Sequence, residues 1–181
     1  MNVESLNHLK YPIGKFIKPE LISEGQINDW IDTIEALPMR LSQLTQDLSV
    51  EQLNWPYRPD GWTIKQVVHH IADSHMNSII RFKWALTEDT PTIKPYFEDR
   101  WATLKDNNDD HLSDTLSLLK GLHAKMGILL RSLTNDDLKR EFIHPEHGKC
   151  FSLEETIGIY AWHSNHHLAH IEQALKYKGK F

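Results

Sequence analysis

Four histidines near the C-terminal end of the sequence have a spacing that places imidazole rings on one side of a helix. They occupy four of the eight positions from 163 to 170: His163, His166, His167 and His170. At about 100° per residue, their four directions fall within roughly a 100° arc. Two imidazoles one turn apart can bind one metal ion from the same helix face, as in H-E-x-x-H. The segment therefore predicts most of a metal site, with the third ligand expected from a second cluster, His69, His70 and His75.

The apolar residues of the C-terminal helix show which of these histidines face the protein core. They form a stripe at helical spacing: Leu153, Ile157, Tyr160, Leu168, Ile171 and Leu175. In projection, His167 lies about 40° and His163 about 80° from the centre of this stripe. His170 and His166 lie further round, at roughly 100° and 140°. The predicted inward pair is therefore His163 and His167, whereas His166 and His170 are expected to face the rim.

The third ligand is less determined by the residues alone. On the helix around residue 70, His75 lies on the apolar stripe, while His69 and His70 flank it on opposite sides. Periodicity favours His75. A flanking side chain can still point into the groove between two neighbouring helices, which keeps His70 as a candidate. His70 is about 10 Å from the start of its helix and His167 about 15 Å from the end of its own, so antiparallel packing would bring these two to similar levels.

Four amphipathic helices are predicted to position these side chains. Sequences of the capping-box form begin three of them, at Ser23, Thr63 and Ser152. Apolar residues then recur at helical spacing over four segments, at residues 23–48, 63–86, 112–133 and 152–177. Pro38 lies inside the first segment and is expected to bend it or break it locally. No segment alternates strictly between apolar and polar residues, and no Asn-Gly or Asp-Gly turn joins two β-rich runs. No strand is therefore predicted.

The four amphipathic helices predict an all-α four-helix bundle, and the connection between the second and third helices is long enough to allow an up-down-down-up topology. Residues 88–109 connect the second and third helices, and some 20 residues can span a bundle about 35 Å long, so these two helices can run parallel. A short helix is expected within this link, around residues 97–104. Pro12, Gly14 and Pro19 predict an extended arm on the surface over about residues 1–22. We interpret residues 1–181 as a single domain.

Composition excludes several classes of partner. The formal net charge is −5, and no long basic or acidic run occurs, which argues against nucleic acid or a membrane surface. No apolar stretch approaches the length of a membrane span, and the first ten residues lack the character of a signal peptide. The single cysteine, Cys150, suits a reducing compartment. We therefore expect a cytoplasmic protein with a small-molecule substrate.

Two elements of the sequence together resemble the DinB/YfiT-like family, in particular its branch of YfiT-type metal-dependent hydrolases. The first is Gly61-Trp62-Thr63 with the run from Val67 to Ser78, and the second is the run from Trp162 to Ile171. Tyr11-Pro12-Ile13-Gly14 extends the resemblance to nearly the whole chain.

This resemblance implies an up-down-down-up four-helix bundle, often a homodimer, with three histidines on one divalent metal ion per chain, nickel or zinc. Residue by residue, the family's ligands fall on His70, His163 and His167. The last two agree with the projection. The choice of His70 as the third ligand rests on the resemblance, whereas the apolar stripe of its helix favours His75.

Three neutral imidazoles leave a coordination position open, as in catalytic sites. A metal so bound can lower the pKa of a bound water to about 7, or can bind a thiolate. The first hypothesis is therefore a metal-dependent hydrolase. The alternatives are a metal-dependent thiol S-transferase, with bacillithiol as the type of low-molecular-weight thiol, and a non-catalytic metal-binding or stress-response protein.

No general base can be assigned from the sequence. Asp73 and Glu155 are candidates by residue type only, and Asp73 could orient an imidazole instead. The remaining histidines are interpreted as ordinary packed or solvated side chains: His111, His123, His144 and His147.

Overall fold

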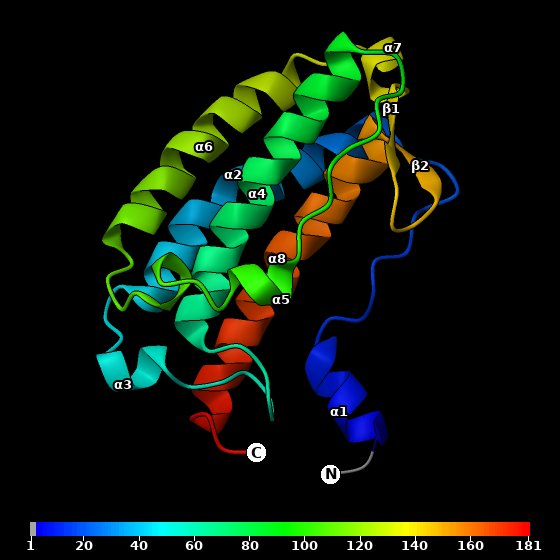
Figure 1. The fold of residues 1–181 in the computed structure, drawn as a ribbon. Helices are drawn as coiled ribbons and strands as arrows, with labels where there is room; N and C mark the ends of the chain where they lie inside the picture. Colours follow the sequence, from blue (N-terminus) through cyan, green and yellow to red (C-terminus); the bar gives the residue numbers. More distant parts are fainter. Residues whose placement is uncertain (1–2) are drawn as a thin grey trace.

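The computed structural model describes residues 3–181 and forms a bundle of four long helices (Figure 1). These helices are α2 (Glu24–Thr45), α4 (Ile64–Thr87), α6 (Ser113–Arg131) and α8 (Leu153–Tyr177). The shorter elements are α1 (Val3–Lys10), α3 (Val50–Leu53), α5 (Glu98–Trp101), the 3-10 helix η1 (Asp106–Asn108), α7 (Asn135–Leu138), β1 (Glu141–His144) and β2 (Lys149–Ser152). In the described part of the chain, no helix has the length and apolar character that would span a membrane.

The topology is up-down-down-up, as predicted. Helices α2 and α8 run in one direction, and α4 and α6 run in the other (Figure 1). Both α2 and α4 pack against α6 and α8, so α2 and α4 occupy opposite corners of the bundle. The parallel pair α4 and α6 is joined by the long link that carries α5 and η1, which runs back along the bundle.

The predicted helix starts are confirmed by their caps. Ser23, Thr63 and Ser152 each accept a hydrogen bond from the backbone N–H three residues later. At Thr63 the box is complete, because the Gln66 side chain also accepts from the Thr63 N–H at 3.0 Å. These caps satisfy N–H groups that would otherwise lack a partner in the first turn. They fix where α4 and α8, the two helices of the histidine clusters, begin.

Pro38 does not break its helix, since α2 is continuous from Glu24 to Thr45. A proline has no N–H to donate to the carbonyl four residues earlier. That carbonyl belongs to Ile34, and it accepts a hydrogen bond from His123 Nδ1 at 2.7 Å. A side chain of α6 therefore replaces the missing helical hydrogen bond and ties α6 to α2 at this level.

The core consists of two apolar clusters separated by a polar layer. The first cluster includes, from the four long helices in turn, Ile34, Phe82, Met126 and Ile157. The second includes Leu37, Val68, Leu119 and Leu168. The positions between them on the helices carry buried polar side chains: Ser74, His75, Ser78, His123 and Ser164. Apolar packing on both sides fixes the helices, so polar groups at mid-bundle are held in position.

Two expectations about the rest of the chain were wrong. The arm predicted to be extended is helical over α1, and only the stretch from residue 11 to α2 lacks regular structure. The region between α6 and α8 contains a hairpin, in which Phe142 pairs with Phe151, although no strand was expected. Strands of four residues are too short for alternation to be recognised. Of the short helix expected at 97–104, only Glu98–Trp101 forms α5.

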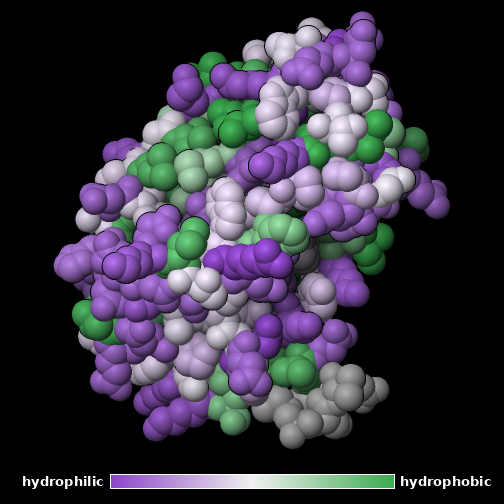
Figure 2. Space-filling model, viewed as in Figure 1, coloured by the Kyte–Doolittle hydropathy of each residue, from purple (hydrophilic) through white to green (hydrophobic). Residues whose placement is uncertain are grey.

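Hydrophilic side chains cover most of the face shown in Figure 2, and apolar ones form separate patches, one of them over the upper part of α6.

Candidate metal centre

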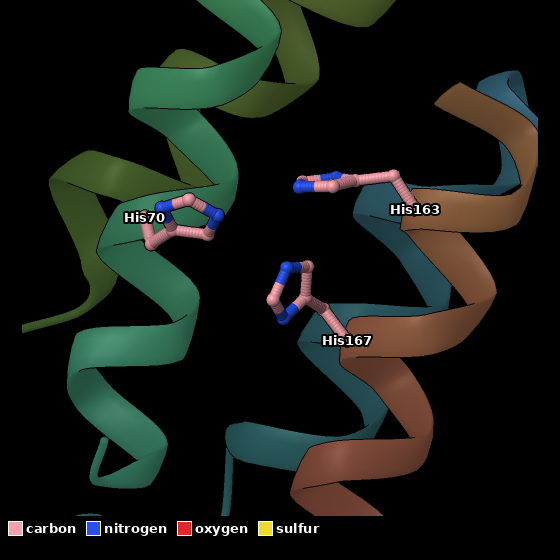
Figure 3. A group of neighbouring side chains, drawn as sticks. All are labelled: His70, His163 and His167. Carbon is pink, nitrogen blue, oxygen red and sulfur yellow. The ribbon is translucent and has the colours of Figure 1, made fainter. Parts of the chain in front are cut away.

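Three imidazole rings from two helices point toward one another at mid-bundle. His163 and His167 project from α8 toward His70 of α4 (Figure 3). Each ring offers one nitrogen such that all three nitrogens lie within 4.8 Å of one another. The rings line a cleft of about 700 Å³. The structure thus brings together His70, His163 and His167, the three side chains that the family resemblance implied as metal ligands.

His167 is held in one orientation and one tautomer by a chain of hydrogen bonds. His170 Nε2 lies 3.1 Å from the backbone carbonyl of Lys10, which can only accept. We therefore assign the proton of His170 to Nε2, so its Nδ1 is an acceptor. His167 Nδ1 lies 3.3 Å from that atom and must donate to it. The lone pair of His167 is then on Nε2, free for a ligand.

His163 is held in the same way by His75. His163 Nδ1 lies 3.2 Å from His75 Nε2. When His163 Nε2 supplies a lone pair to a metal, Nδ1 carries the proton and His75 Nε2 accepts it. His75 is fully buried, stacks on His123 with ring centroids 4.8 Å apart, and lies edge-on to Tyr160 at 5.1 Å. Its neighbours thus fix the ring that orients His163.

The two candidates for the third ligand occupy different places in the structure. His70 faces the rings of α8, with ring centroids 5.4 Å from His163 and 4.9 Å from His167, and packs against Trp62 at 4.6 Å. His75, which periodicity favoured, lies behind His163 as its hydrogen-bond partner. His75 is the most deeply buried histidine of α4, so it lies on the apolar stripe, whereas the histidine that lines the cleft is His70.

The rings are neutral at neutral pH because the protein shields them from water: His70 and His167 are buried, and His163 is half-buried. Burial, with a smaller contribution from the charge of His166, lowers the pKa of His70 to about 4. Burial also holds the pKa of His163 and of His167 well below the usual value, and the neighbouring histidines add to the effect. Neutral imidazole is the form that binds a metal. Three neutral imidazoles with free lone pairs are a donor set that fits a divalent metal ion.

His166 and His170 do not face the rim as predicted. Their exposed fractions are 6% and 2%. Tyr11 stacks on His166 at 5.9 Å, and Tyr57 stacks on His170 at 3.8 Å. The projection considered only packed helices, whereas these rings are covered by the N-terminal arm and by the segment before α4.

The two carboxylates considered as general bases have structural partners outside the three-histidine cluster. Asp73 Oδ2 accepts a hydrogen bond from Asn107 Nδ2 at 2.7 Å, so it fastens η1 to α4 and does not orient a ligand. Glu155 is buried and forms ion pairs with Lys18 at 2.9 Å and Lys149 at 3.3 Å.

Sequence reasoning missed cleft residues that only the tertiary structure brings to the histidines, namely Tyr96, Arg81 and His144, and it missed the contact of Tyr160 with the His163 ring. Their sequence neighbourhoods carry no motif that could have pointed to them. Burial raises the pKa of Tyr96, so its phenol stays protonated and can donate a hydrogen bond.

Replacing His75 with phenylalanine tests the hydrogen bond to His163. The His75→Phe variant keeps the ring stack but removes the acceptor, so the His163 N–H loses its partner. We expect metal affinity to fall by about 10- to 100-fold, the range for partners that orient metal ligands. A competition titration with a chromogenic chelator measures this. His69→Phe is the control, because His69 is also buried on α4 but bonds Thr115 and Asp109. Equal losses in both variants would contradict this assignment.

Comparison with known proteins gives a consistent result. The family model of the DinB superfamily matches residues 33–171. A Bacillus subtilis protein named "Putative metal-dependent hydrolase YfiT" is 47% identical over 172 residues, which is 95% of this chain and 97% of the relative. A Bacillus cereus (strain 03BB102) protein named "Putative metal-dependent hydrolase" is 50% identical over 171 residues, covering 94% and 98%.

A solved structure is equally similar. It is described as YfiT from Bacillus subtilis, "a probable metal-dependent hydrolase with an unusual four-helix bundle topology", and it superimposes with a TM-score of 0.92 at 47% identity. The match covers 95% of this chain and 98% of that one.

Proposed function

Because the chain belongs to the DinB superfamily, we propose that it is a metal-dependent hydrolase whose ion is bound by His70, His163 and His167. The observation that carries the proposal is the convergence of three neutral rings in a cleft large enough for a small molecule. The proposed ion is nickel or zinc, one per chain, since imidazole nitrogen suits both.

A divalent ion on three imidazoles supplies Lewis acidity and activates water at neutral pH. The chain's own residues hold and orient that chemistry. His170 keeps the proton of His167 on Nδ1, so that ring presents Nε2 to the cleft. With Nε2 of His163 on the ion, His75 Nε2 would accept the proton of His163 Nδ1 and hold that ring in place. Trp62 packs against His70 and restricts its rotation. The protonated phenol of Tyr96 can donate a hydrogen bond to a substrate oxygen.

An assay of the metal-loaded protein against panels of esters, amides and thiol-plus-electrophile pairs tests this function. We expect hydrolysis of a member of the ester or amide panel without added thiol, and its loss after chelation and in His167→Ala. Thiol-dependent consumption of an electrophile, with no hydrolysis, would replace the hydrolase by an S-transferase on the same ligands. Inactivity on every panel would contradict both enzymes and favour a metal-binding protein without turnover.

A further inference from the structure

The cleft contains a guanidinium group whose Nε has no hydrogen-bond partner in the described part of the protein. Arg81 of α4 is half-buried, and its Nε is fully buried with no hydrogen-bond partner. Its Nη1 reaches only the Tyr160 hydroxyl, at 3.5 Å. No carboxylate in the described part of the chain lies within ion-pair distance of Arg81. A buried N–H group without an acceptor is unfavourable unless something else supplies one.

A second unpartnered nitrogen lies on the hairpin next to α4. His144 of β1 has a buried Nδ1 with no hydrogen-bond partner. Both side chains line the cleft, and β1 packs against α4. Burial lowers the pKa of His144, and the positive charge of Arg81 lowers it further. The ring is therefore neutral and can place its one proton on Nδ1. Two side chains that line the same cleft, Arg81 and His144, thus each carry a nitrogen without a hydrogen-bond partner among the described residues.

Arg58, the other arginine that lines this cleft, has a hydrogen-bond partner for its Nε, unlike Arg81. Arg58 donates from Nε to the Tyr57 hydroxyl at 3.2 Å and from Nη1 to the Pro59 carbonyl at 2.8 Å. Two of its donors, including Nε, thus have acceptors within the protein, whereas Nε of Arg81 has none within residues 3–181.

We propose that Arg81 and His144 bind an anionic group, a carboxylate or a phosphate, of the small molecule whose reacting bond lies at the three histidines. This inference rests on the proposed function, because it defines the substrate class of the same site. A guanidinium donates two parallel N–H groups, the geometry that carboxylate and phosphate oxygens accept.

The distances set the size of such a substrate. Arg81 contacts Tyr160, and the Tyr160 ring lies 5.8 Å from the His163 ring between centroids. About one side chain therefore separates the anion subsite from the metal centre. The cleft is also lined by Glu98, Asp99 and Glu146, which would repel a polyanion. The site fits a compact molecule with one or two negative charges.

Binding of succinate, its neutral analogue succinamide and inorganic phosphate to the metal-loaded protein tests the subsite. Isothermal titration is made on wild type, Arg81→Met and the matched control Arg58→Met. We expect at least tenfold weaker binding of the preferred anion to Arg81→Met, unchanged binding to Arg58→Met and weak binding of succinamide to all three. Metal content should stay at the wild-type value in both variants, and far-UV circular dichroism checks their folding.

Each outcome decides the proposal. Arg81-dependent binding of succinate identifies a carboxylate substrate, and Arg81-dependent binding of phosphate alone identifies a phosphate. Equal affinity of wild type and Arg81→Met, equal affinity for succinate and succinamide, or no binding of any probe overturns it. If Arg81→Met does not fold, Arg81→Lys replaces it, with weaker anion binding expected because the fork is lost. Arg81-dependent binding in a protein without hydrolytic activity would retain the anion subsite and reject the hydrolase. Hydrolytic activity without Arg81-dependent binding would retain the hydrolase and reject the anion subsite.

Discussion

The His167→Ala variant is expected to lose its stoichiometric metal ion while keeping the helical content of the wild-type protein. The substitution leaves two of three ligands and also removes the donor that His170 holds in place. The loss of affinity should exceed the roughly 10- to 100-fold effect of removing an orienting partner, because a ligand atom itself is lost. Alanine favours helix, and the two apolar clusters that hold α8 are unchanged, so the bundle should remain folded.

Elemental analysis of the purified variant, together with far-UV circular dichroism, measures both parts of this prediction. His166→Ala is the matched control, because His166 is the adjacent residue on α8, is equally buried and lies outside the three-histidine cluster. We expect it to retain one ion per chain. If His167→Ala retains metal at the wild-type ratio, the proposed ligand set is wrong. If both variants lose the metal ion equally, the site depends on more histidines of α8 than His163 and His167.

Acidification is expected to unfold the metal-free protein steeply, starting below about pH 6.5, the ordinary histidine pKa. Burial lowers the pKa of His70 and His166 to about 4 and that of His170 to about 3. The folded-state pKa values lie below those of the unfolded chain, so between them the unfolded chain binds more protons. The free energy of unfolding must therefore fall as pH falls through this window.

The effect is large because several histidines act together: His70, His75, His163, His166, His167 and His170 all have lowered pKa values. Each contributes at most about 1.4 kcal/mol per pH unit, against a total stability of about 5–15 kcal/mol. Two pH units are thus enough to unfold the chain.

Circular dichroism and tryptophan fluorescence followed against pH after chelation measure the transition. The metal-loaded protein should unfold at lower pH, because an ion bound only to the folded state stabilises it. Stability that does not change between pH 7 and pH 4 would show that these rings take up protons without unfolding.

The features that were predictable from the sequence depend on short stretches of chain. Capping residues at Ser23, Thr63 and Ser152 and a helical apolar period act within one or two turns, so the long helices and their starts were found. The length of their connection allowed α4 and α6 to run parallel, and the family resemblance implied that they do. The inward direction of His163 and His167 followed from the apolar stripe of α8.

The features that were missed depend on contacts between distant segments. The burial of His166 and His170 requires knowing that Tyr11 and Tyr57 cover α8. The apolar stripe of α4 marks the face that packs against its neighbouring helices together, without distinguishing between them. It therefore could not show that His70 opens to the cleft while His75 lies behind His163. The unpartnered state of Arg81 is a property of the assembled cleft, because no local pattern records the absence of a carboxylate nearby.

The hydrogen bond between His123 and the Ile34 carbonyl makes positions 38 and 123 interdependent. It exists because Pro38 leaves that carbonyl free. A residue with an N–H at position 38 would compete for the same carbonyl, and His123 could then turn away from His75. The two positions should therefore vary as a pair among homologous sequences, with the proline retained wherever the histidine is, although neither residue reaches the cleft histidines directly.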